Sequence, residues 1–372
     1  MKETENTETM VPQPGELDRA RALLLDWYDR CGRVLPWRQS PTPYAVWVSE
    51  IMLQQTRVEA VKPYYARFLS ELPDFEALAA APQEKLLVLW EGLGYYSRVR
   101  HMQQAAQIIV SEYGGRMPRE YEKVLALPGV GAYTAGAVLS FAYNLPYPAV
   151  DGNVQRVLAR MCGLQEDILL PATRKKQTEF AAAFLDRERP GDFNQALIDI
   201  GATVCLPGGK GVKPKCLGCP FEGVCRAHRM GWEHLLPVRV PKTGKRDEDL
   251  TVILLRQGIR FAVRKRPEDG LLGGLYEFPN VPGRLDRSGV EAQVRKWGLI
   301  PLAIRPLREA EHVFSHLRWH MTGWLAEVEP AEPDQTLVFV TSGERRERYA
   351  LPGAFSAYVP YLEEDLSGTE TE

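Results

Sequence analysis

The stretch LPGVGAYTAGA, residues 127–137, decides how the N-terminal part of the chain folds. The residues before it, REYEKVLA, have a helical pattern, and Pro128 ends that helix because proline cannot donate a backbone N–H. Gly129 and Gly131 allow backbone torsions that side chains would block, and the next helix is expected to start at about Ala132. The sequence therefore predicts a helix, a glycine-rich hairpin and a second helix.

The hairpin suits the binding of an anion. Its glycine N–H groups and the positive end of the second helix would point outward together, which fits one phosphate of a DNA backbone. A plain tight turn between two packed helices is the alternative.

The composition is that of a globular protein of two or three domains. The 372 residues are 45% hydrophobic and 25% charged, with a formal net charge of −2. No apolar run reaches the roughly 18 residues that a membrane span needs. The N-terminus, MKETENTETM, lacks the basic and apolar regions of a secretion signal. We therefore expect a cytoplasmic protein without a membrane partner. The net charge argues weakly against nucleic acid, but basic residues cluster locally, and such patches matter more than the sum.

The spacing of apolar residues changes once along the chain. Residues 16–235 repeat apolar positions every three or four residues, which predicts a mainly α-helical domain. Residues 236–247 are rich in proline and charge and are typical of a linker. Strand-like runs with one amphipathic helix predict an α+β domain over residues 248–365. We expect the polar residues 1–15 and 366–372 to be disordered.

Two carboxylates stand in contrasting surroundings. Glu50 lies in the apolar helical stretch AVWVSEIMLQQT, where burial would raise its pKa and keep a proton on it at neutral pH. Asp151 directly precedes a helix, whose N-terminus favours the ionised form. One protonated and one ionised carboxyl can together break a bond to a sugar's anomeric carbon. A surface position for Glu50 and an ordinary helix N-cap for Asp151 are the alternatives.

Four of the six cysteines form the pattern C-x10-C-x2-C-x5-C, at Cys205, Cys216, Cys219 and Cys225. Without an export signal, this grouping indicates a metal site rather than disulfides. Four such thiolates can hold a 4Fe-4S cluster or a structural zinc ion, and the spacing alone leaves both open. Lysines at 210, 213 and 215 lie in the enclosed loop and would form a basic finger for the DNA backbone.

Together these segments resemble the helix-hairpin-helix DNA glycosylases with an iron–sulfur cluster, and most closely the MutY family of adenine DNA glycosylases. The resemblance covers about residues 16–365. The matching segments are LPWR (35–38), VSEIMLQQTRV (48–58), WEGLGYYSRVR (90–100), LPGVGAYTAGA (127–137), AVDGNV (149–154), the four cysteines, GLLGGLYEFP (270–279) and HVFSHLRWH (312–320).

The resemblance implies a catalytic region of two helical subdomains with a 4Fe-4S cluster held by the four cysteines, followed by a Nudix-like α+β domain. It implies a monomer that removes adenine mispaired with 8-oxoguanine or guanine in double-stranded DNA. The absence of targeting signals suits a bacterial cytoplasm, where we expect the protein at the nucleoid. Glu50 would protonate the adenine, and Asp151 would stabilise or transiently bond to the anomeric carbon, with Tyr133 and Asn153 beside them. The residues implied to contact DNA are Arg38, Gln55, Thr56, Tyr95, Gly129, Gly131, Ser315 and His316, of which the last two would read 8-oxoguanine.

Tyr133 bears on the reaction type. In the endonuclease III-like sister family a lysine at this position forms a Schiff base with the sugar and cuts the backbone, which a phenol cannot do. We therefore expect a monofunctional glycosylase in which water takes the anomeric carbon. An endonuclease III-like glycosylase/lyase is one alternative, disfavoured by Tyr133 and by the extra C-terminal domain. A non-catalytic lesion-binding protein is the other, disfavoured by the presence of both Glu50 and Asp151.

The chain departs from the family pattern in two places. Ten residues rather than the usual six separate Cys205 from Cys216, and the extra length is expected to loop outward without moving the sulfurs. The segment GLLGGLYEFP resembles the opening of a Nudix box, but the helix GVEAQVRKWG lacks the carboxylates that would bind magnesium. We therefore expect the C-terminal domain to recognise DNA and not to hydrolyse nucleotides.

Overall fold

The protein is described here by a computed structural model covering residues 14–209, 211–240, 244–330 and 334–362. The segments predicted to be disordered lie outside the described residues, apart from residues 14 and 15, which open the first helix.

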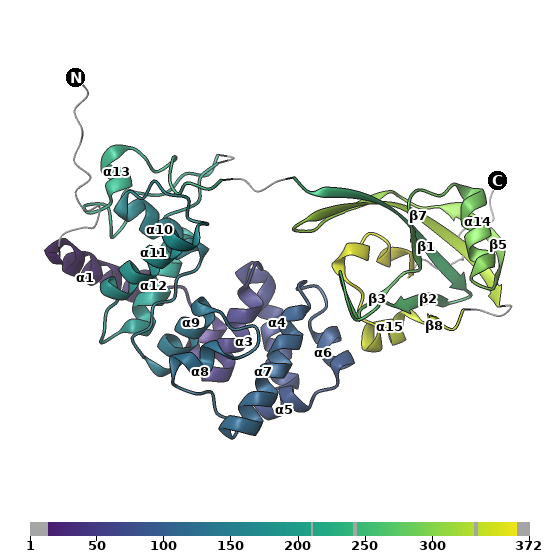
Figure 1. Cartoon of the computed structure of the whole chain (residues 1–372), viewed down its shortest axis with the longest axis horizontal. Coiled ribbons are helices and arrows are strands. Elements are labelled where there is room, and N and C mark those ends of the chain that lie inside the picture. The colour runs from purple at the N-terminus through teal and green to yellow at the C-terminus, as the bar shows by residue number, and fades with distance from the viewer. Residues whose placement is uncertain (1–13, 210, 241–243, 331–333, 363–372) are drawn as a thin grey trace. The chain divides into compact units, whose positions relative to one another are not determined.

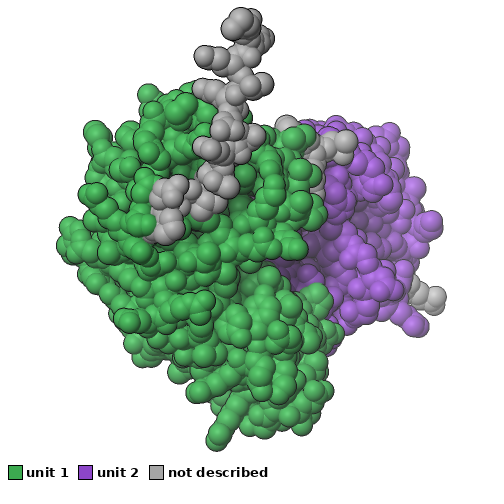
Figure 2. All heavy atoms as spheres, turned by 60° about the vertical axis from the view of Figure 1, so that its left-hand side comes forward, with its two compact units in different colours: residues 1–79, 101–241 green, residues 80–100, 242–372 purple. Residues whose placement is uncertain are grey.

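The chain divides into two compact units, drawn in green and purple in Figure 2. One consists of residues 1–79 and 101–241, and the other of residues 80–100 and 242–372. Residues 80–100, which the sequence analysis placed with the helical domain, thus group with the C-terminal part.

The named elements in the described residues of the first unit are all helices, as the apolar spacing predicted, joined by turns and loops (Figure 1). Proline stands in the first turn of several helices, where its missing N–H costs nothing. The helices are α1 (Pro14–Cys31), α2 (Pro36–Gln39), α3 (Pro43–Leu53), α4 (Val58–Glu71), α5 (Phe75–Ala80), α7 (Ser97–Tyr113, which starts in the other unit), α8 (Tyr121–Leu125), α9 (Ala132–Tyr143), α10 (Gly152–Cys162), α11 (Pro171–Phe184), α12 (Pro190–Thr203) and α13 (Arg226–Met230).

The predicted hairpin joins α8 to α9. Gly129 has a φ of +73°, and a Cβ added there would lie 2.7 Å from the Cβ of His101, so this position requires glycine. Gly131 does not: its φ is −101° and an added Cβ would meet open space. The expectation that its torsions exclude a side chain is wrong. Helix α9 packs against α3, whose residues 44–52 are all buried.

The second unit is built on a mixed sheet that is eight-stranded in its described residues, which confirms the predicted α+β character (Figure 1). Its main path runs β3-β2-β1-β7-β5, in which β1 and β7 are parallel and the other neighbours antiparallel. The elements are α6 (Gln83–Leu89), β1 (Arg246–Gln257), β2 (Arg260–Lys265), β3 (Tyr276–Glu277), β4 (Asn280–Pro282), α14 (Arg287–Lys296), β5 (Leu299–Pro306), β6 (Ala310–Val313), β7 (Leu317–Pro330), β8 (Leu337–Val340), α15 (Ser342–Arg348), η1 (Gly353–Phe355) and η2 (Val359–Leu362).

Apolar side chains alternate along β1 and build a core on each face of the sheet. Val252 and Leu254 pack in the core that includes residues of η1 and η2, whereas Ile253 and Leu255 pack in the core that includes residues of α14. Strand β1 begins at Arg246, within the segment 236–247 that the sequence predicted as a linker. None of the helices in the described ranges combines the length and apolar composition needed to cross a membrane.

Candidate active site

A cavity of about 750 Å³ in the first unit brings the predicted catalytic residues together. Its walls come from α1, α2, α3, α9, α12, the start of α10 and the turns after α1 and α3. Of the predicted site residues, those lining it are Arg38, Glu50, Gln55, Thr56, Tyr133, Asp151 and Asn153. Glu50 and Asp151 therefore face one common space rather than separate surfaces.

Glu50 is a buried carboxyl near the end of α3, with 5% of its surface exposed. The Tyr133 hydroxyl, from the first turn of α9, donates a hydrogen bond of 2.5 Å to Glu50 Oε2. Burial raises the pKa of Glu50 to about 7, helped by the nearby Asp151 and opposed by the Tyr133 hydrogen bond and the Arg38 charge. Near neutral pH a large fraction of Glu50 thus carries a proton, as its apolar helix predicted.

Asp151 is the N-cap of α10, and its carboxylate accepts three hydrogen bonds. Oδ1 accepts from the backbone N–H groups of Asn153 (2.8 Å) and Val154 (2.7 Å), and Oδ2 accepts from Asn153 Nδ2 (2.9 Å). Burial raises the pKa of Asp151, while these bonds oppose the rise. The hydrogen bonds at the helix N-terminus therefore lower the pKa of Asp151, as expected, but the opposite effect of burial is larger. With three donors against one, the negative charge of the pair is better stabilised on Asp151 than on Glu50.

Asn153 is held by a chain of contacts that sequence reasoning missed. Arg156 Nη2 donates to Asn153 Oδ1 (2.9 Å), which turns the amide nitrogen of Asn153 toward Asp151. Arg156 also donates to the carbonyl of Gly201 (2.7 Å) and, through Nε, to that of Cys205 (2.8 Å). The orientation of the Asp151 carboxylate is thus tied to the backbone beside the first cysteine.

Arg38, predicted to contact DNA, is engaged within the cavity wall. Its Nη1 and Nη2 donate to Asp199 at 2.8 and 2.9 Å, and Arg33 Nε donates to the same carboxylate at 2.8 Å. Burial opposes ionisation of Asp199, but the two arginines outweigh it and lower its pKa. Sequence reasoning missed Asp199 and Arg33. An acid in the apolar helical stretch ALIDIGA was the available signal for Asp199.

Comparison with known proteins adds to this geometry. Residues 48–183 match the HhH-GPD superfamily base excision DNA repair protein family, and residues 251–360 match the NUDIX domain. The adenine DNA glycosylase of Homo sapiens is 37% identical over 82% of this chain and 66% of its own length. That of Rattus norvegicus is 37% identical over 80% of this chain and 68% of its own length. The chain belongs to the adenine DNA glycosylase family. Members of the family are hydrolases acting on N-glycosyl bonds.

A solved structure supports the helical fold. A thermostable thymine-DNA glycosylase, 28% identical, covers 58% of this chain and 98% of its own, with a TM-score of 0.53. This match supports the fold of the helical unit of this adenine DNA glycosylase family member. The fold of the sheet domain is supported by the NUDIX match instead.

Two predicted DNA-contacting residues occupy strained, exposed turns. Gln55, after α3, has a φ of 59°, and Tyr95, before α7, has a φ of 46° with 49% of its surface exposed. Left-handed backbone costs free energy for a residue other than glycine and is concentrated at functional sites. Thr56 lies half-buried beside Gln55, with its hydroxyl 3.4 Å from the carbonyl of Gln54. The roles of these residues toward DNA stay predictions.

A second cavity, of about 600 Å³, lies within the second unit. Tyr95 lines it together with the exposed Ser315 and His316, and the Gly270–Gly273 stretch forms another part of the wall. The two residues predicted to read 8-oxoguanine thus share one space with Tyr95, which is also predicted to contact DNA.

The four cysteines also line one small cavity, together with apolar side chains and with Arg160, Lys215, Glu222, His228 and Glu233. Arg160 Nη1 donates to Cys205 Sγ at 3.2 Å. The extra residues after Cys205 turn back on themselves through a bridge between Gly209 and Val212, so Cys205 still reaches the other three. Lys210 lies outside the described residues.

The four thiols lie around one cavity, and such a donor set can hold either a 4Fe-4S cluster or a structural zinc ion. The residues present therefore fit the cluster that the resemblance implied.

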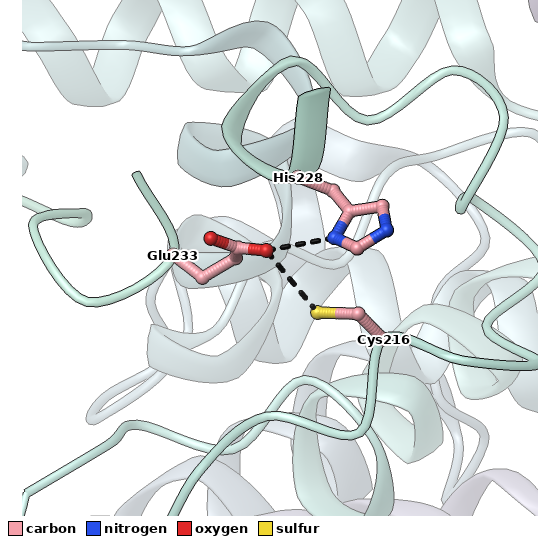
Figure 3. Close-up of side chains that lie close together, drawn as sticks. All are labelled: Cys216, His228 and Glu233. Carbon is pink, nitrogen blue, oxygen red and sulfur yellow. Dashed lines mark hydrogen bonds and ion pairs between the residues drawn. The ribbon is translucent and has the colours of Figure 1, made fainter. Parts of the chain in front are cut away.

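Two further possible metal ligands, His228 and Glu233, line the same cavity and lie close to Cys216 (Figure 3). Glu233 Oε1 lies 2.7 Å from His228 Nδ1 and 3.8 Å from Cys216 Sγ. The sequence analysis did not identify His228 or Glu233. Burial opposes ionisation of Glu233, but hydrogen bonds, first of all the one with His228, outweigh it and lower the pKa of Glu233.

Proposed function

We propose that this chain excises adenine from adenine:8-oxoguanine and adenine:guanine mispairs in double-stranded DNA by hydrolysing the N-glycosidic bond. The observation that carries the proposal is one cavity lined by a carboxyl that holds its proton, Glu50, and a carboxylate stabilised by three donors, Asp151. A proton donor for the leaving base and a carboxylate to stabilise the sugar are the two groups needed to break a bond to an anomeric carbon. The chain would act as a monomer in a bacterial cytoplasm.

The geometry supports the following order of events. The target adenine leaves the base stack and enters the cavity, since its glycosidic bond is inaccessible inside the duplex. Glu50 transfers its proton to a ring nitrogen of adenine. The bond between the anomeric carbon and the base then breaks, and its electron pair leaves with the neutral adenine. Asp151 stabilises the oxocarbenium-like sugar, and water adds to the anomeric carbon and loses a proton.

Hydrolysis without strand cleavage is supported by the cavity lining. Tyr133, not a lysine, follows the hairpin, and it is engaged by Glu50 at 2.5 Å. Among the described residues that line the cavity there is no lysine. A Schiff base with the sugar needs a primary amine at this place.

We further propose that Ser315 and His316 recognise 8-oxoguanine, because they line the cavity that Tyr95 also enters. Replacing His316 by alanine would chiefly lower the preference for adenine opposite 8-oxoguanine over adenine opposite guanine. An unchanged ratio of single-turnover rates would remove this loop from recognition.

We also propose that Cys205, Cys216, Cys219 and Cys225 hold a 4Fe-4S cluster. When bound, the cluster would crosslink the loop and stiffen it, with Lys213 and Lys215 exposed for phosphate contacts. About four iron and four sulfide per chain in the purified protein is the expected analysis. Zinc without sulfide would contradict it.

A duplex with one adenine:8-oxoguanine pair tests the proposed reaction. The chain is expected to release free adenine and to leave a site that breaks only after hot alkali, while a Glu50→Gln variant still binds the duplex and releases none. Nicking without alkali, or a borohydride-trapped adduct with DNA, would indicate a glycosylase/lyase instead. Binding without any adenine release would indicate a lesion-binding protein.

A further inference from the structure

The turn that carries Tyr95 is braced from within the second unit. Trp90 Nε1 donates to the carbonyl of Gly94 (3.1 Å), and Arg98 Nη2 donates to that of Leu93 (2.9 Å). These contacts hold the carbonyls inward and present the Tyr95 side chain outward. The left-handed backbone of Tyr95 costs free energy, so the turn keeps this conformation only because the surrounding contacts stabilise it.

Two further contacts tie the turn to the sheet domain, one on each side of Tyr95. Arg345 Nη1, on α15, lies 2.5 Å from Glu91 Oε1, four residues before Tyr95. Arg100 Nη2, five residues after Tyr95, donates to the carbonyl of Gly273. The Arg345 and Glu91 side chains are 10% and 27% exposed, so water screens the ion pair only in part.

The helix that carries Arg345 is itself well anchored. Thr341 and Glu344 form a reciprocal capping box at its start, with Glu344 N–H donating to Thr341 Oγ1 (3.2 Å) and Thr341 N–H donating to Glu344 Oε2 (2.8 Å). Helix α15 also packs on α6, which leads into the Tyr95 turn. The helix therefore holds the positively charged Arg345 side chain in a fixed position next to Glu91.

We infer that the Glu91–Arg345 ion pair is a positioning contact for recognition of the base opposite the adenine. It holds the Tyr95 turn against the sheet domain, so that Tyr95 and the Ser315–His316 loop face one cavity. The inference rests on the proposed function. Neither Glu91 nor Arg345 lines the cavity of Glu50 and Asp151, so the pair would affect discrimination between opposite bases and not the chemical step.

The test compares Arg345→Gln and Glu91→Gln with a swapped double variant, Glu91→Arg with Arg345→Glu, all in the full chain. Arg348→Gln removes an exposed charge from the same helix and is the matched control. Single-turnover adenine release is measured opposite 8-oxoguanine and opposite guanine. Hydrogen–deuterium exchange over residues 90–98 is measured without DNA, so it does not depend on any activity.

Each single variant is expected to lower the ratio of adenine release opposite 8-oxoguanine to release opposite guanine about tenfold. The reason is that removing one partner leaves the other charge partly buried and unpaired. Exchange over residues 90–98 should accelerate in the same variants, and the swap should restore both readouts. Unchanged exchange, or faster exchange with an unchanged preference, would overturn the inference. Should the unaltered chain release no adenine opposite either base, the proposed function fails, whereas the exchange data still decide whether the ion pair holds the turn.

Discussion

Replacing Glu50 by glutamine is expected to stabilise the catalytic unit while abolishing adenine release. In the folded chain the pKa of Glu50 is about 7, against an ordinary value of 4.5. The folded state therefore binds the proton more tightly than the unfolded state. The stability that this provides is fully present below pH 4.5 and is lost as pH rises through about 7. At about 1.4 kcal/mol for each pKa unit, the loss amounts to about 3 kcal/mol.

Thermal melting at pH 5 and pH 8 measures this effect. A glutamine keeps the shape and can still accept the Tyr133 hydrogen bond, but it has no proton to lose. The Glu50→Gln variant should melt close to the unaltered chain at pH 5 and about 6–12 °C above it at pH 8 for a unit of this size. Glu112→Gln, an exposed substitution on α7, should follow the unaltered chain at both values.

The result that would refute the reasoning is a pH dependence of melting that is the same in Glu50→Gln as in the unaltered chain. The carboxyl would then titrate alike in the folded and unfolded states, and it could not be the proton reservoir that the mechanism needs. A gain in stability together with a loss of activity would place Glu50 among residues kept for chemistry at a cost to folding.

Two further substitutions concern α9, the helix that packs against the Glu50 helix. Tyr133→Phe removes the donor to Glu50, so the pKa of Glu50 should rise further, and the high-pH limb of single-turnover adenine release should move up by about one pH unit. Tyr143→Phe is its control, and a limb that stays or moves down would contradict the assignment. Gly136→Ala would place a Cβ 2.1 Å from the carbonyl oxygen of Pro148 and should destabilise the unit by about 1–3 kcal/mol in urea unfolding. An unchanged midpoint would show that the backbone there can yield.

Much of the site could be predicted because its signals are local in the sequence. Pro128 and Gly129 predict the hairpin, and the position of Asp151 one residue before a helix predicts its role as an N-cap. Glu50 is surrounded by apolar neighbours along its own helix, so its burial follows from the same segment. The pattern of four cysteines likewise survives its longer loop.

What could not be predicted depends on contacts between distant segments. Asp199 is visible in the sequence only as an acid in an apolar helix, and its meaning comes from Arg33 and Arg38, more than 160 residues away. The grouping of residues 80–100 with the sheet domain likewise involves a distant partner, since Glu91 contacts Arg345, 254 residues away. Local patterns carry no information about such partners.

The division of roles between two similar carboxyls follows from where each stands on its helix. Glu50 lies within α3, where backbone N–H groups are already bonded along the helix, so only a side chain, Tyr133, can donate to it. Asp151 lies ahead of α10, where the first N–H groups have no partner in the helix and two of them donate to Oδ1. Glu50 is buried and Asp151 is half-buried, and desolvation raises the pKa of both. The position of each acid on its helix therefore favours one division of roles. The acid inside a helix keeps the proton, and the acid at the start of a helix carries the negative charge, since the unbonded N–H groups there donate to it.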